Sequence, residues 1–183
     1  FCKGEDAGLV WDTIVSEGKS FGIIPTCFTT LDWLRVESSL LFYPYDMSQM
    51  YPFDKDPPGD SLWELGLDFT VSPGKNDFHG AEAPARLKGK ERFKIFGLLV
   101  DGKVPADMGD PVYSSGKKVG VVTCAMVSSL TGKSMALARL DVPVAVHGTK
   151  LEIRGKNVKG LAMAHTLRFD DAEHPRPRIA GLR

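Results

Sequence analysis

The sequence contains few cysteines and no excess of charge of either sign. Its 183 residues include three cysteines, at positions 2, 27 and 124, and no Cys-x-x-Cys pair. This scattered, odd set does not predict a disulfide framework and favours a reducing compartment, so we expect a cytoplasmic protein. Lys and Arg number 23, as do Asp and Glu, so the net charge is zero. We therefore predict no nucleic-acid partner, because such proteins usually carry a basic surplus.

Long apolar runs and a signal peptide are also lacking. The run "IFGLLV" at residues 95–100 is typical of the longest, whereas a membrane span needs roughly 18 apolar residues. We therefore predict no membrane partner. The chain begins with Phe1 rather than Met and has no signal-peptide pattern, so we expect it to be a piece of a longer protein.

Motifs that hold metals or phosphates are missing as well. The histidines form no i, i+4 pair and no His-Glu-x-x-His motif, so no metal site is predicted. Gly-Lys-Ser occurs at 18–20 and 132–134, but a P-loop needs a glycine five positions before the first glycine. Those positions hold Thr13 and Val127. We interpret residues 131–134 as a hairpin turn.

The first 85 residues mix helical and extended patterns. Apolar spacing predicts one helix from about Asp6 to Gly18 and another from about Thr30 to Ser39. We predict a short or edge strand at 20–28, a further strand at 65–75 and a partly helical stretch at 76–93. Residues 44–61 hold four prolines and predict a long loop, which in a compact domain is often functional.

The remaining residues, 86–183, alternate β-rich runs with turn signals such as "DGK" and "HGTK". Short strands at this spacing are typical of an antiparallel barrel or sandwich. The run "GVVTCAMV" is apolar on both faces and predicts a strand buried on both sides. We predict an α+β fold, with an α+β segment at 1–85, an antiparallel β-barrel at 86–183 and an extended tail at 173–183.

Glu37 does not fit its surroundings. In a helix it would neighbour the apolar residues at 33, 34, 40 and 41, where a carboxylate is costly unless it has a partner. Arg35 is two positions away and points to another face. The partner is then a distant Lys or Arg, or a ligand. A carboxylate binds planar, forked donors through both oxygens, and the edges of pterins and guanidines have this shape.

Three blocks of the sequence resemble the glycine-cleavage T-protein (aminomethyltransferase) family. They are "GIIPTCFTTLDWLRVESSLLFYPYDM" at 22–47, "WELGLDFTVSPGKNDFHG" at 63–80, and the β-rich region from "PVYSSGKKVGVVTCAMV" onward. Residues in the first block that match the family pattern are Pro25, Asp32, Leu34, Arg35, Glu37, Tyr43 and Asp46. The resemblance implies that residues 1–85 are the C-terminal part of a folate-binding domain and residues 86–183 the T-protein C-terminal barrel.

The resemblance also implies a reaction class. T-proteins bind tetrahydrofolate and move a one-carbon unit, aminomethyl or methyl, between a small donor and the folate. Carried over, Glu37 would hold the amino-pyrimidine edge of the pterin, Lys75 would lie near the folate, and Tyr43 would line the same region. We expect a monomer whose cofactor is tetrahydrofolate and whose longer form is a transferase.

Two departures from the family pattern bear on activity. Phe28 stands where the family has a glycine, near the expected donor site. The family's catalytic Asp belongs to an earlier segment that this chain does not contain, so we expect no catalytic residue here and no activity from these residues alone. The alternatives are a folate-binding protein without transferase activity, a folate-dependent demethylase, or a β-barrel interaction module.

Overall fold

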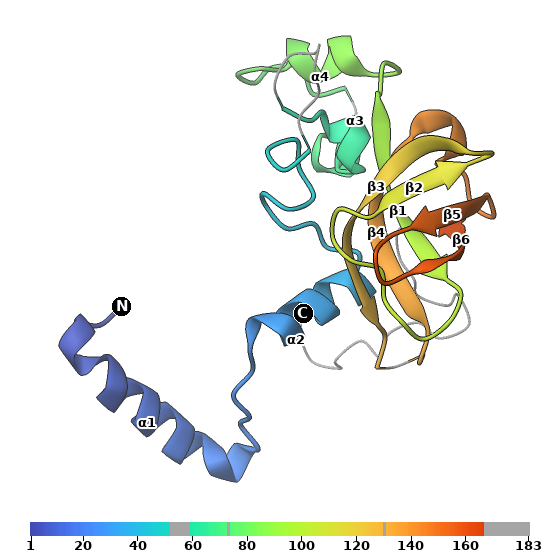
Figure 1. The fold of residues 1–183 in the computed structure, drawn as a ribbon. Coiled ribbons are helices and arrows are strands. Elements are labelled where there is room, and N and C mark those ends of the chain that lie inside the picture. Colours follow the sequence, from blue (N-terminus) through green and yellow to red (C-terminus); the bar gives the residue numbers. More distant parts are fainter. Residues whose placement is uncertain (52–58, 73, 130, 167–183) are drawn as a thin grey trace. The chain divides into compact units, whose positions relative to one another are not determined.

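The computed structural model describes residues 1–51, 59–72, 74–129 and 131–166, and the chain divides into two compact units, 1–31 and 32–183 (Figure 1). The predicted tail at 173–183 and part of the predicted loop, 52–58, lie outside the described residues. Among the described residues, no helix is both long enough and apolar enough to cross a bilayer.

The first unit is helical. The 3-10 turn η1 (Gly4–Asp6) leads into α1 (Ala7–Gly18) and η2 (Lys19–Phe21). The predicted helix is therefore confirmed, although the Asp6 side chain makes no capping hydrogen bond. The strand predicted at 20–28 is wrong. There the chain turns through Gly22, at a φ of 73° that favours glycine, and then runs without regular structure to α2.

Helix α2 (Phe28–Glu37) confirms the second predicted helix to within two residues at each end. Asp32 accepts a hydrogen bond from Arg35 Nε at 2.8 Å. Only the last turn of the helix contains buried residues, namely Arg35 and Val36. The end of α2 is therefore the part of the helix that is anchored to the rest of the second unit.

The strand predicted at 65–75 is also wrong, because short helices occupy this region. They are α3 (Leu62–Leu65) and η3 (Asp68–Thr70), followed by α4 (Glu82–Leu87), which confirms the partly helical stretch. Ser61 and Glu64 form a capping box at the start of α3, and Gly66 ends the helix with a φ of 68°. Reciprocal capping satisfies two backbone donors, and this local signal outweighed the alternating apolar pattern.

Six antiparallel strands close into a barrel in the order β1-β4-β3-β2-β5-β6, which confirms the predicted α+β class and the barrel. The strands are β1 (Phe93–Val100), β2 (Pro111–Ser114), β3 (Lys117–Val127), β4 (Ser134–Asp141), β5 (Lys150–Arg154) and β6 (Lys159–His165). The 3-10 turn η4 (Val142–Val144) follows β4. Closure removes the free edges of the sheet. The boundary between domains 1–85 and 86–183 stays a prediction.

Strands β3 and β4 are covered on both faces, as the apolar run in β3 predicted. Their inward residues, such as Val122 and Leu140, belong to the core inside the barrel. Their outward residues belong to a second apolar cluster that includes Val36 of α2. The register between the two strands shifts at Thr123, which is a β-bulge. A bulge changes the direction in which a side chain points, and here the Thr123 hydroxyl donates a hydrogen bond to Asp46.

Glu64 joins α3 to the start of the barrel. Its carboxylate accepts hydrogen bonds from Arg92 Nε at 2.7 Å and Arg92 Nη2 at 3.1 Å, and from the Ser61 backbone N–H at 2.7 Å. Burial alone would raise the pKa of Glu64, but the hydrogen bonds from Arg92 and Ser61 outweigh it and lower the pKa from 4.5 to about 2. The ionised carboxylate therefore stabilises the folded state.

The stability of the second unit should reflect this carboxylate. Because the folded pKa is depressed, the contribution of Glu64 is present above pH 4.5 and is lost as the pH falls toward 2. The shift corresponds to on the order of 3 kcal/mol. In urea denaturation, we expect Glu64→Gln to be less stable than the wild type at pH 7, and the gap to narrow below pH 4.5 and to be nearly closed at about pH 2. Glu82→Gln, at an exposed position, is the control. A gap that does not change with pH would contradict this account.

Candidate functional site

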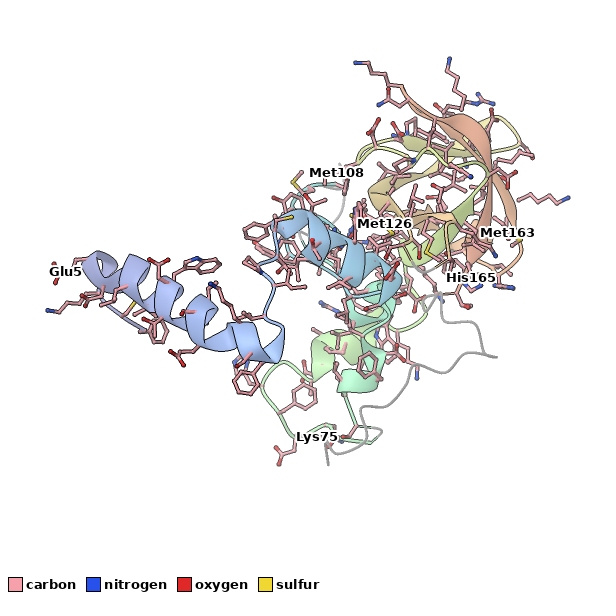
Figure 2. The ribbon with its side chains drawn as sticks, turned by 90° about the horizontal axis from the view of Figure 1, so that it is seen from below. Glu5, Lys75, Met108, Met126, Met163 and His165 are labelled. Atoms are coloured by element: carbon pink, nitrogen blue, oxygen red, sulfur yellow. The ribbon has the colours of Figure 1, made fainter. Side chains whose placement is uncertain are left out.

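Three consecutive residues hold the end of α2 against the barrel. Val36 is fully buried and packs on the outer faces of β3 and β4, against Cys124, Met126, Met135 and Leu137. Figure 2 shows Met126 between α2 and the strands. Arg35 and Glu37, on either side of Val36, reach different polar partners. Apolar packing thus fixes the position of the helix end. That position determines which partners the Arg35 and Glu37 side chains can reach.

Arg35 forms a buried ion pair with Asp46. Arg35 Nη1 lies 2.7 Å from Asp46 Oδ2, and the two residues are 4% and 0% exposed. Asp46 also accepts hydrogen bonds from the Phe42 backbone N–H at 2.8 Å and from the Thr123 hydroxyl. Burial alone would lower the pKa of Arg35, but the hydrogen bond to Asp32 and the charge of Asp46 raise it. The charge of each partner is therefore satisfied inside the fold.

A second buried arginine ties the same loop to β4. Arg139 Nη1 donates to the Asp46 carbonyl oxygen and to Asp60 Oδ1, at 3.1 Å in each case. Its guanidinium lies 3.6 Å from the ring centroid of Phe93. Asp60 in turn accepts from the Ser48 backbone N–H at 2.7 Å. The described ends of the long loop are therefore fixed by charged hydrogen bonds, which are stronger than neutral ones.

Glu37 is bound by the barrel. Its Oε1 atom accepts a hydrogen bond from the Ser128 hydroxyl at 2.6 Å. Ser128 directly follows β3 and is 2% exposed, while Glu37 is half-buried. The neighbouring residues Leu34 and Leu40 are exposed. The apolar surroundings expected from helical spacing are therefore open to solvent at these positions.

The other two predicted folate residues have different surroundings. Tyr43 is 66% exposed. Lys75 is exposed on the segment between η3 and α4, and its Nζ lies 6.0 Å from the ring centroid of Phe78 (Figure 2). A cavity of about 460 Å³ on the outer face of the barrel is lined by Met50, Tyr51, Arg139 and neighbouring residues of β1, β3 and β4, and by none of these three. A site shared by Glu37, Tyr43 and Lys75 thus stays a prediction.

Sequence reasoning missed several residues of this region. Thr123, Ser128 and Arg139 lie in the barrel, far along the chain from α2. They fall within the third block that resembles the T-proteins, but nothing in the sequence places them against α2 or the long loop. A partial signal existed for the ion pair, because Arg35 and Asp46 both stand in the block that resembles the T-proteins. Among the described residues, no group of three or more His, Cys, Asp or Glu side chains could hold a metal ion.

The fold and the anchored helix define a class: a closed six-stranded antiparallel barrel with a preceding segment docked on its outer face. Residues 94–169 match the family model of the glycine cleavage T-protein C-terminal barrel domain. Aminomethyltransferase T of Bartonella henselae has the same fold, with a TM-score of 0.64 at 23% identity over 76% of this chain and 37% of that chain. The match to this family model confirms the resemblance found in the sequence.

Curated relatives extend the match to nearly the whole chain. The chain is 56% identical to the heme-dependent oxidative N-demethylase gamma subunit of Ectopseudomonas mendocina, over 99% of the chain and 48% of that protein. It is 37% identical to trimethylamine-oxide aldolase of Ruegeria pomeroyi, over 84% of the chain and 18% of that protein. It is 34% identical to an aminomethyltransferase of Thermotoga neapolitana, over 86% of the chain and 41% of that protein. The chain thus spans half or less of the length of these relatives.

Asp46, the buried partner of Arg35, should contribute more to stability than Asp32, the half-exposed partner. Asp46→Ala leaves a buried guanidinium without its buried counter-charge, which typically costs roughly 3–5 kcal/mol of unfolding free energy. Asp32→Ala removes the half-exposed partner of the same guanidinium and should cost about 1 kcal/mol or less. Urea denaturation of both variants measures the difference. Equal losses would show that burial does not set the strength of this network.

Proposed function

We propose that the longer form of this protein binds tetrahydrofolate and uses it to accept a one-carbon unit, as an aminomethyltransferase-like transferase. The observation that carries the proposal is Glu37, a half-buried carboxylate at the end of α2 whose Oε1 atom accepts a hydrogen bond from Ser128. Such a carboxylate suits the amino-pyrimidine edge of a pterin, because that edge presents parallel N–H donors. The aminomethyltransferases among the relatives support the same reaction class.

The names of two relatives suggest the source of the carbon. One is a heme-dependent oxidative N-demethylase subunit and the other acts on trimethylamine oxide, so N-methylated amines are common to both. Removal of two electrons and one proton from an N-methyl group, by an oxidant such as the heme named for the first relative, would leave an iminium ion. Water would convert this ion to the free amine, formaldehyde and a proton. Tetrahydrofolate supplies nitrogen nucleophiles that condense with formaldehyde and release water. We propose that this protein supplies the folate site that takes up formaldehyde released in this way.

A partner subunit would then carry out the oxidation. The relative named as a gamma subunit supports an assembly of several chains, in place of the monomer expected from the sequence. In this assembly, the residues described here bind and orient the folate rather than break the C–N bond. Positioning of two reactants is itself a large part of catalysis.

Glu37 provides the direct test of folate binding. In the full-length protein, Glu37→Gln removes the charge and places an amide donor against a pterin donor. Loss of a charged hydrogen bond costs roughly 1.5–3 kcal/mol, which corresponds to about 10- to 150-fold weaker binding of tetrahydrofolate. Isothermal titration calorimetry measures the affinity, and Glu82→Gln, an exposed carboxylate on α4, is the control. Unchanged affinity in a folded Glu37→Gln variant would assign Glu37 a purely structural role.

Lys75 tests a contact with the tail of the folate. Its exposed ammonium lies beside Phe78, where it could meet the carboxylates of a polyglutamate tail. The contact would be solvent-exposed and weakened by salt. We expect Lys75→Ala to weaken tetrahydrofolate polyglutamate more than the monoglutamate, and Lys117→Ala, on the barrel, to affect neither. The same loss for both ligands would contradict a role in binding the tail.

A further inference from the structure

Ser128 is the first residue of the hairpin that joins β3 to β4, and its backbone is fixed on both sides. Its N–H donates to the Lys133 carbonyl at 2.9 Å, and its carbonyl accepts from the Gly132 N–H at 2.8 Å. The side chain is buried, with a residue exposure of 2%. The barrel hairpin, and not the α2 segment, therefore fixes the position of the Ser128 hydroxyl.

The hydrogen bonds around this hydroxyl have a defined direction. The Thr131 backbone N–H donates to Ser128 Oγ at 3.2 Å, so one lone pair of the hydroxyl is already used. An ionised carboxylate can only accept, so the hydroxyl proton must point to Glu37 Oε1 at 2.6 Å. The bond restrains the Glu37 carboxylate at its Oε1 atom. The barrel hairpin thereby sets the direction in which Glu37 meets any ligand.

The stability of α2 does not account for this arrangement. Glu37 is the last residue of the helix, where the exposed carbonyl ends of the backbone disfavour a negative charge. The docking of the helix end is already provided by the burial of Val36 and by the ion pair of Arg35. A carboxylate at an unfavourable helix position, on a surface that is only half-buried, suits recognition of a ligand.

We infer that Ser128 is a positioning residue of the folate site: it holds the Glu37 carboxylate in the orientation that receives the amino-pyrimidine edge. This inference rests on the proposed function and assigns part of that site to the barrel. Ser128 acts through Glu37 and need not touch the ligand. Its loss should therefore affect only those ligand groups that Glu37 binds, which separates positioning from a general loss of structure.

The test is a double-mutant cycle in the full-length protein. Calorimetry measures the affinity of wild type, Ser128→Ala, Glu37→Gln and the double variant for tetrahydrofolate and for its analogue without the 2-amino group. We expect Ser128→Ala to weaken tetrahydrofolate binding about 5- to 15-fold, less than Glu37→Gln does, because Ser128 acts only through Glu37. We expect much smaller losses for the analogue and no further loss in the Glu37→Gln background. Ser128→Cys, which keeps the size but donates poorly, should repeat the pattern if Ser128→Ala does not fold.

Ser134→Ala is the matched control. Ser134 is also a fully buried serine of this hairpin region, but its hydroxyl donates to the Val104 carbonyl at 3.3 Å. It should change the melting temperature without changing folate affinity. If the wild type does not bind tetrahydrofolate, both the proposed function and this inference fail. If Glu37→Gln weakens binding while Ser128→Ala and Ser128→Cys do not, or if the serine variants weaken both ligands equally, only the positioning role is overturned.

Discussion

The ion pair between Arg35 and Asp46 is the interaction on which the arrangement of the second unit depends. Two buried charges lose their hydration, so the pair is favourable only when its remaining hydrogen-bonding groups are satisfied. Here Phe42 and Thr123 donate to the carboxylate of Asp46, while Asp32 binds the same guanidinium. Satisfied buried networks rigidify the parts that they join. The pair thereby links α2, the long loop and the barrel at one point.

Strand β3 supplies most of the barrel side of this junction. Its bulge turns Thr123 toward Asp46, its outward residues Cys124 and Met126 pack beneath Val36, and Ser128 after its last residue binds Glu37. The first and last of these contacts are hydrogen bonds from a hydroxyl to a carboxylate, and the second is apolar burial. Because all three act along one strand, a shift in its register would disturb them together. The irregularity in β3 is therefore part of this junction.

The sequence predicted those features that depend on local or repeated patterns. Recurrent turns between β-rich runs indicated the barrel, and helical spacing placed α1 and α2 within about two residues. The two strands that were wrongly predicted, at 20–28 and 65–75, were short apolar stretches in which turn and capping signals at Gly22 and Ser61 prevailed. The geometric argument that Arg35 could not pair with Glu37 agrees with the partners observed for Arg35. The Ser128 partner lies 91 residues from Glu37, and only tertiary structure could bring it there.

The surroundings of Glu37 also indicate what a complete site requires. Trp33, Leu34, Leu40 and Tyr43 are all exposed, so the described residues by themselves leave a ligand at Glu37 largely in water. Small-molecule sites usually bury about 70–90% of the ligand surface, and a charged hydrogen bond gains strength only when water is excluded. The proposed folate site therefore needs further walls beyond the described residues. The gamma-subunit relative, of which this chain matches 48%, has the length to supply them. On this view, the barrel and the end of α2 provide the rigid, oriented side of the pocket, and the missing walls provide its enclosure.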